Sequence, residues 1–143
     1  MTPAQIRRVR RSFATAVLNL DHVSDAFCKH LQRLDPGRGP VFDGDPLMQR
    51  MKVGGALAGL VGSLGRLDRI RPALGKLGRQ RASQGVVQEP YAMIGEALIA
   101  ALRDVLGDQC DAATQRAWLL AYGQVVEIMT EHAADERVSV QAA

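Results

Sequence analysis

One arginine stands where a helical pattern calls for an apolar residue. Within LGKLGRQRASQG, residues 74–85, Leu74 and Leu77 continue a helical stripe that begins at Ile70, and Arg81 comes next on that stripe. At about 100° per residue these four positions share one face of a helix. A guanidinium stays protonated, offers several N–H donors and has no acceptor. Arg81 could therefore bind an anionic group, or serve as the cation that a helix C-terminus favours.

Other reactive side chains lack the spacing of a catalytic or metal site. Glu127 and Glu131 are one helical turn apart, but no acid–base partner accompanies them. Cys28 and His30 are two residues apart, so on a helix they point in different directions and cannot share a metal ion. No glycine-rich phosphate loop follows a strand. These patterns predict that the domain is not an enzyme.

The three histidines indicate structural and surface positions. His22 and His132 are expected to face solvent, whereas His30 shares the apolar side of its helix and is expected to be a partly buried structural residue. Between Val53 and Glu131 the chain has no histidine. Any imidazole ligand would therefore have to come from the ends of the chain.

Helices must position these side chains, because helical periodicity covers nearly the whole sequence. Thr2, Pro3 and Gln5 form a capping-box pattern at the start of the first helix. Further helices are expected at about 21–34, 46–64, 67–82 and 88–106, with Gly85 ending the fourth, and a last one after the cap Asp111. Residues 133–143 are expected to form a frayed tail. The pattern predicts a single all-α domain over 1–143 with about six to eight helices.

Two features of the helical faces can be checked directly. Periodicity predicts that Val17, Met48 and Leu119 face inward with the other apolar residues of their helices. Glycines cost stability inside a helix, so Gly54, Gly55 and Gly59 within residues 46–64 are expected to allow close approach of another backbone or of a flat ligand.

Composition excludes several broad classes. The 143-residue chain has a net charge of +3, but residues 1–84 hold 15 Lys and Arg against 6 Asp and Glu, while residues 85–143 hold 3 against 9. Such a charge dipole can orient partners or pair two copies. Nucleic-acid binding is not expected, because basic residues lack interleaved aromatics and a reading helix. The absence of long apolar runs, of an apolar signal core and of a cysteine framework favours the cytoplasm.

The order of motifs resembles a known family. VFDGD, MQRMKVGGALAGLVGSL, LGRQRASQGV, PYAMIGEALIAAL and AWLLAYGQVVEIM are similar, over about residues 3–133, to bacterial single-domain globins and to the globin half of flavohaemoglobins. The resemblance implies a globin-like fold with a haem pocket. It assigns pocket positions to six residues: Phe42 against the haem, the distal Gln49 and Val53, Cys28 in place of a distal tyrosine, Tyr91 near the proximal side, and Arg81 in place of the iron-binding histidine. The family reads LGRRH where this chain reads LGRQR.

The substitution at residue 81 leaves three hypotheses. Because guanidinium has no lone pair for iron, no cofactor is expected, and the chain would be a haem-free sensing or interaction module. Alternatively it binds haem and gas with unusual ligation by Cys28, His30, Met48 or Met51. A third hypothesis is a carrier of an apolar carboxylate paired with Arg81. The expected partners are a second copy, through the last two helices, or another protein.

Overall fold

Six α-helices build the protein. The computed structural model describes residues 1–37, 45–83 and 91–142, with residues 46, 78, 80–83 and 131–142 described by their backbone only. The helices are α1 (Pro3–Ala16), α2 (Leu20–Leu34), α3 (Pro46–Ser63), α4 (Leu67–Ser83), α5 (Tyr91–Leu106) and α6 (Ala112–Ala142). Two short 3-10 turns, Val17–Asn19 and Gly107–Gln109, follow α1 and α5. No strand occurs in the described ranges, which confirms the all-α class.

Side-chain caps start three of these helices where the sequence predicts them. The hydroxyl of Thr2 accepts from the amide of Gln5, whose side chain accepts from the Thr2 amide in return. Asp45 accepts from the amide of Leu47 before the first-turn proline of α3. Asp111 accepts from the amide of Thr114 at 2.8 Å, and hydrogen bonds from Thr114 lower the pKa of the Asp111 carboxyl. Each cap satisfies amide groups that the first helical turn leaves without partners.

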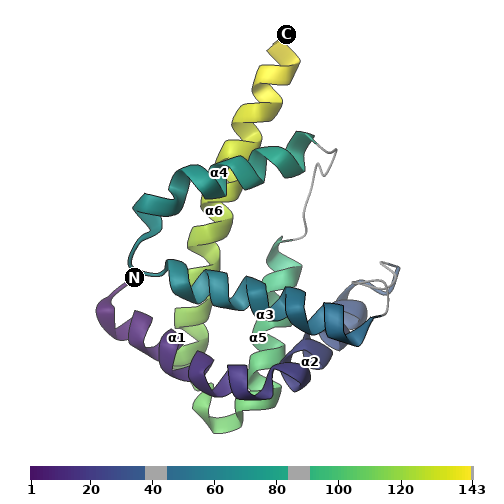
Figure 1. Ribbon diagram of the computed structural model, residues 1–143, viewed down its shortest axis with the longest axis vertical. Helices are drawn as coiled ribbons and strands as arrows, with labels where there is room; N and C mark the ends of the chain where they lie inside the picture. Colours follow the sequence, from purple (N-terminus) through teal and green to yellow (C-terminus); the bar gives the residue numbers. More distant parts are fainter. Residues whose placement is uncertain (38–44, 84–90, 143) are drawn as a thin grey trace.

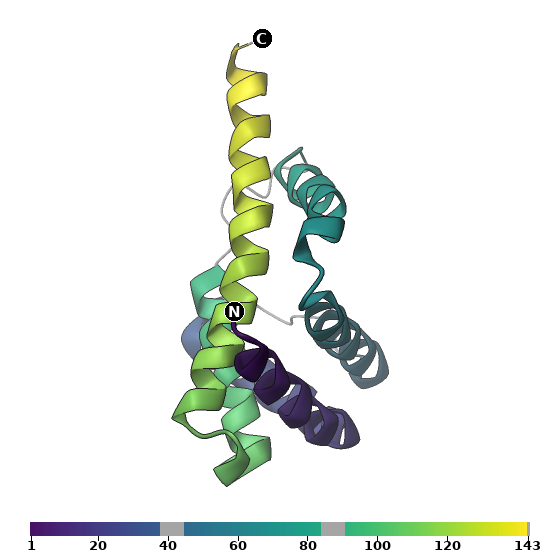
Figure 2. The same ribbon diagram turned by 90° about the vertical axis from the view of Figure 1, so that its left-hand side faces the viewer.

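Helix α6 is the long element against which the others pack. In Figure 1, α4 crosses α6, and α1 and α3 cross the lower part of the molecule in front of α5 and α6. Figure 2 shows α3 and α4 on the same side of α5 and α6. The most extensive packing joins α4 to α6 and α2 to α5. The core between these helices includes the fully buried Val9, Val23, Leu102 and Trp118.

Three of the residues expected to face inward do not do so. Val17, Met48 and Leu119 are all exposed. Val17 lies in a 3-10 turn, whose tighter winding removes it from the stripe of α1. Met48 lies about 140° around α3 from the buried Val53, and Leu119 lies about 100° around α6 from Trp118. A helix buries only the part of its apolar surface that another helix covers, and here the covered part is narrower than the stripe.

The end of α6 differs from the expected frayed tail. The backbone continues as helix to Ala142, and its C-terminal end extends beyond α4 in Figure 2. Residues 133–142 contain three alanines with one glutamate, one arginine and one glutamine, all of which favour helix, and no glycine or proline. The expected stop at Gly85 and the start of the fifth helix at 88 lie outside the described residues.

The glycines of α3 have different surroundings. A Cβ on Gly54 would lie 2.5 Å from Cδ2 of Leu20, so α2 and α3 approach closely there through a side chain. Gly55 and Gly59 have nothing within 4 Å of that position, so the expected approach of another backbone is not found at these two, and Gly54 makes room for a leucine side chain instead. In the described ranges, no helix is long and apolar enough to cross a bilayer.

Gly95→Ala is expected to destabilise the protein by about 1–3 kcal/mol, because the added methyl would meet a rigid ring. The Cβ would lie 2.8 Å from Cε1 of Tyr122, whose hydroxyl donates to the carbonyl oxygen of Tyr91 at 2.8 Å. Urea unfolding measures the loss. Gly55→Ala is the control, since its methyl enters open space and alanine favours helix by about 1 kcal/mol. Equal stability of the two variants would contradict the packing argument.

Candidate functional site

The six pocket positions come from five segments of the chain. Gln49 and Val53 lie on α3, Cys28 on α2 and Tyr91 at the start of α5. Arg81 lies on α4, where only its backbone is described, and Phe42 lies outside the described residues. The structure therefore describes four of these side chains.

The side chain of Gln49 joins α3 to α2. It is half-buried, and its Nε2 donates to the carbonyl oxygen of Ser24 on α2 at 3.3 Å. Four residues later, one turn along α3, Val53 is buried in the core. The amide of Gln49 thus links α3 to the α2 backbone.

A buried polar group lies beside this contact. The hydroxyl of Ser24 is buried and has no hydrogen-bond partner among the described residues. Cys28 lies one turn further along α2, so the two side chains share a face. Burial, and then the charge of Asp25, raises the pKa of the Cys28 thiol above its ordinary value. Cys28 is therefore a neutral thiol near pH 7, and a neutral thiol is a poor metal ligand and nucleophile.

Ser24, Cys28 and Gln49 together form what we call the distal polar cluster. The unpaired hydroxyl of Ser24 can donate to, or accept from, one small polar group at this place. Ser24 was not predicted from the sequence, although its spacing of four residues from Cys28 was a visible signal.

Ile70, Leu74, Leu77 and Arg81 share one face of α4, which we call the α4 stripe. Among the residues of α4 whose burial is described, only Gly75 is buried, and α4 packs against α6. Ile70, Leu74, Leu77 and Arg81 lie between about 100° and 160° around the helix from Gly75. Ile70 and Leu74 are half-buried, whereas Leu77 is 42% exposed. Arg81 on this stripe is described by its backbone only, and α4 continues beyond residue 81 to Ser83.

Tyr91 is held from α6. It is half-buried as the first residue of α5, and its carbonyl oxygen accepts from the hydroxyl of Tyr122. Because the ring of Tyr122 also contacts Gly95, the start of α5 is fixed against α6.

His30 is a structural residue, as the sequence predicts. Its Nε2 lies 2.6 Å from Oδ2 of Asp104 on α5, and its Nδ1 lies 3.2 Å from Nη2 of Arg33. Arginine can only donate, so Nδ1 accepts and Nε2 donates to the carboxylate. Both ring nitrogens are engaged, and neither is available to iron. His22 is exposed on α2, and the side chain of His132 is not described.

The donor groups do not fit a histidine-ligated haem. Iron in such a haem takes an electron pair from a neutral imidazole nitrogen, and a guanidinium has none to give. The residue on the α4 stripe is arginine, and the described imidazoles lie on α2. Met48 and Met51 of α3 carry sulfur but are both exposed. Among the described residues no group of three or more His, Cys, Asp or Glu could hold a metal ion.

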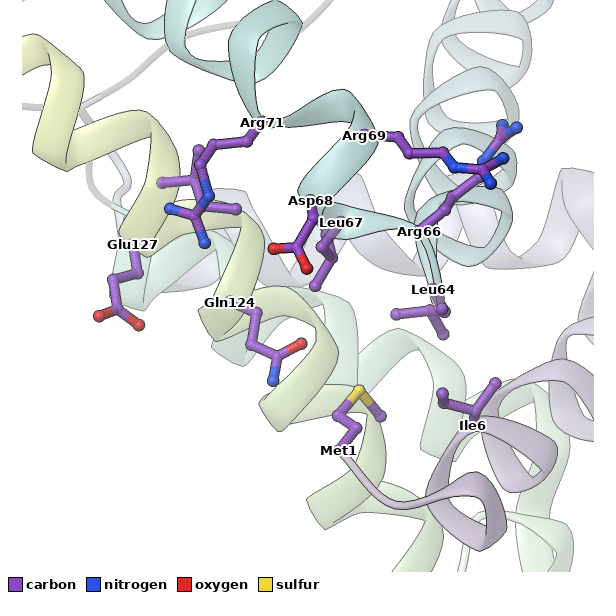
Figure 3. A pocket seen from close by; sticks show the side chains of 12 residues that line it. Met1, Ile6, Leu64, Arg66, Leu67, Asp68, Arg69, Arg71, Gln124 and Glu127 are labelled. Carbon is purple, nitrogen blue, oxygen red and sulfur yellow. The ribbon is translucent and has the colours of Figure 1, made fainter.

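A surface cavity lies elsewhere in the described part of the chain. It has a volume of about 590 Å³ and lies between the start of α1, the corner between α3 and α4, and α6 (Figure 3). Both charge signs line it, with Arg66, Arg69, Asp68 and Glu127 among its residues. Nε of Arg66 donates to the carbonyl oxygen of Gly62 at 3.0 Å. The cavity shares no residue with the six pocket positions.

Comparison with known proteins identifies the relatives of this chain. A family profile described as Globin matches residues 43–129. The flavohemoprotein of Bacillus subtilis (strain 168) is 30% identical over 79 residues, which are 55% of this chain and 20% of that protein. The flavohemoprotein of Rhizobium meliloti (strain 1021) is 34% identical over 62 residues, 43% of this chain and 15% of that protein. Neuroglobin of Danio rerio is 34% identical over 70 residues, 49% of this chain and 44% of that protein. The matched stretch therefore spans about a fifth or less of these flavohemoproteins.

Proposed function

This chain belongs to the globin family, and we propose that it is a member that does not bind haem in the family's usual way and acts as a helical sensing or interaction module. Its globin fold would then supply a protein surface and a pocket rather than a gas-binding iron. The flavohemoproteins are named for a flavin and a haem, and these groups are properties of those proteins. We further propose that the domain has no catalytic activity of its own.

One observation carries the proposal. The position that the resemblance assigns to the iron ligand is Arg81, near the end of α4. A guanidinium there repels cationic iron and has no lone pair to offer it. His30 supports the proposal, because both of its ring nitrogens are engaged by Asp104 and Arg33.

The distal side gives further support. In a gas-binding pocket a distal glutamine would need its amide directed at the bound gas, but Gln49 donates to the α2 backbone. The raised pKa of Cys28 also keeps this thiol protonated and therefore poorly suited to binding iron. Without an iron-bound gas, the side chain of Gln49 contributes to the contact of α3 with α2.

Haem titration of the purified protein tests the proposal. Under reducing conditions and in the presence of hemin, we expect a broad absorption spectrum like that of free haem and no saturation at one haem per chain. The intact flavohemoprotein of Bacillus subtilis, treated in the same way, serves as the positive control.

Uptake of one haem with a sharp Soret band would overturn the proposal and favour unusual ligation. Cys28→Ser, Met48→Leu and Met51→Leu would then identify the ligand, because loss of the true ligand must change the spectrum. Met48 and Met51 are exposed, so their replacement is not expected to unfold the protein.

A further inference from the structure

Four exposed residues follow one another along one face of α6. Arg116, Leu120, Gly123 and Glu127 follow one another at intervals of four, three and four residues. These intervals place them within about 40–60° of one another on the helix. All four are exposed, and we call this line the α6 stripe.

The α6 stripe is open in the monomer. Leu120 is 44% exposed, and the neighbouring Leu119 is 48% exposed. A Cβ on Gly123 would meet nothing within 4 Å. In the described part of the chain, neither Arg116 nor Glu127 forms an ion pair within 4 Å. Glu127 also lines the cavity of Figure 3, where its carboxylate points away from the guanidinium of Arg71.

Two copies of the α6 stripe are complementary to each other when the helices run antiparallel. Two antiparallel copies of α6 that cross between residues 121 and 122 place Arg116 opposite Glu127 of the second copy. The same register places Leu120 opposite Gly123, so that a large side chain meets a position without one. Both matches occur twice because of the two-fold axis, as an isologous interface requires. A parallel pairing would instead place arginine beside arginine and glutamate beside glutamate.

We propose that two copies of this chain pair antiparallel through the α6 stripe. Leucine against glycine brings the helices close together, and the two Arg–Glu pairs at the ends fix the register. The proposal goes beyond the proposed function and does not depend on whether haem is bound. The sequence predicts pairing through the last two helices. The present proposal restricts the interface to α6, because α6 alone supplies the complementary residues.

The length of the stripe sets the strength expected of the dimer. From Arg116 to Glu127 the helix rises about 16 Å, so the contact is shorter than most stable interfaces need. We therefore expect a reversible dimer with a dissociation constant of roughly 10–100 µM. Since its charge pairs lie at exposed ends, the dimer is expected to weaken as salt concentration rises.

Sedimentation equilibrium of charge variants tests the pairing. Arg116→Glu and Glu127→Arg each create two like-charge contacts in the dimer, so each is expected to raise the dissociation constant at least about tenfold. The double variant Arg116→Glu/Glu127→Arg restores both pairs in the opposite sense and is expected to return within about threefold of the original value. Lys29→Glu, an exposed reversal on α2, is the control and should leave dimerisation unchanged.

Several results would overturn the proposal. A monomer at about 1 mM protein in low salt would remove the dimer altogether. A dimer that is insensitive to both single reversals would place the interface on another face. A double variant as weak as the singles would exclude the antiparallel register. Far-ultraviolet circular dichroism of each variant separates loss of pairing from loss of folding.

Discussion

Replacing Trp118 with alanine is expected to lower the free energy of unfolding by about 3–5 kcal/mol. Trp118 has an exposed fraction of 0% and is the largest of the fully buried side chains. It lies on α6 within the core that α1 and α5 share. Domains of this kind have a total stability of about 5–15 kcal/mol, so the variant should be partly unfolded near 37 °C.

Part of this effect comes from one hydrogen bond. Nε1 of Trp118 donates to Oγ of Ser12 at 2.9 Å, and this hydroxyl donates in turn to the carbonyl oxygen of Arg8 at 2.8 Å. Ser12→Ala would leave a buried indole N–H without a partner, at a cost of about 1–3 kcal/mol. Trp118→Phe combined with Ser12→Ala removes both partners, and the pair is expected to cost less than the sum of the single variants.

Urea unfolding followed by circular dichroism measures these changes, since Trp118 is the only tryptophan and cannot serve as a common fluorescent probe. Leu119→Ala is the matched control. It removes an apolar side chain from the adjacent, exposed position and is expected to change stability by no more than about 0.5–1 kcal/mol. If Trp118→Ala and Leu119→Ala were equally stable, the core described around Trp118 would be wrong.

Helix positions were predictable because their signals are local. Thr2, Asp45 and Asp111 each accept from an amide two or three residues later, and prolines follow the first two. A cap can be read from adjacent letters because the atoms that it joins are adjacent in the chain. These signals fixed the starts of α1, α3 and α6 to within a residue.

The part of each helix face that is buried by another helix was harder to predict. Periodicity identifies the apolar side of a helix, but the width of the buried part depends on which helix packs against it and at what angle. Leu119 belongs to the apolar side of α6 and is nevertheless exposed beside the buried Trp118. The bond between His30 and Asp104 joins residues 74 positions apart, so the sequence indicated burial of His30 and not its partner.

The candidate site was predicted from resemblance more than from chemistry. Motif order assigned Gln49, Val53 and Cys28 to one pocket, and the structure places Gln49 at the contact between α3 and α2 and Cys28 on α2. The contact of Gln49 with the Ser24 carbonyl could not be read from the sequence, because any residue type can supply a backbone carbonyl. The unpaired hydroxyl of Ser24 was missed for a related reason, since a serine within a helix usually bonds to its own backbone.

Arg81→His is expected to give the protein a haem affinity at least about a hundredfold above that of the original chain. Partners that merely support a metal ligand change metal affinity by about 10- to 100-fold, so supplying the ligand itself should have a larger effect. The helix that would carry the new imidazole already exists, because α4 extends beyond residue 81 to Ser83. The substitution also removes a cation from the position assigned to iron.

Absorption spectra during hemin titration measure this gain as a sharp Soret band that saturates at one haem per chain. Lys76→His is the control, because it adds a histidine to the exposed surface of α4, about 130° around the helix from the α4 stripe. The new band should also weaken below about pH 6, since imidazole must lose its proton before it can bind iron. If Arg81→His behaved like Lys76→His, the arginine would not be what separates this chain from haem-binding globins, and the cause would lie in other residues of the chain.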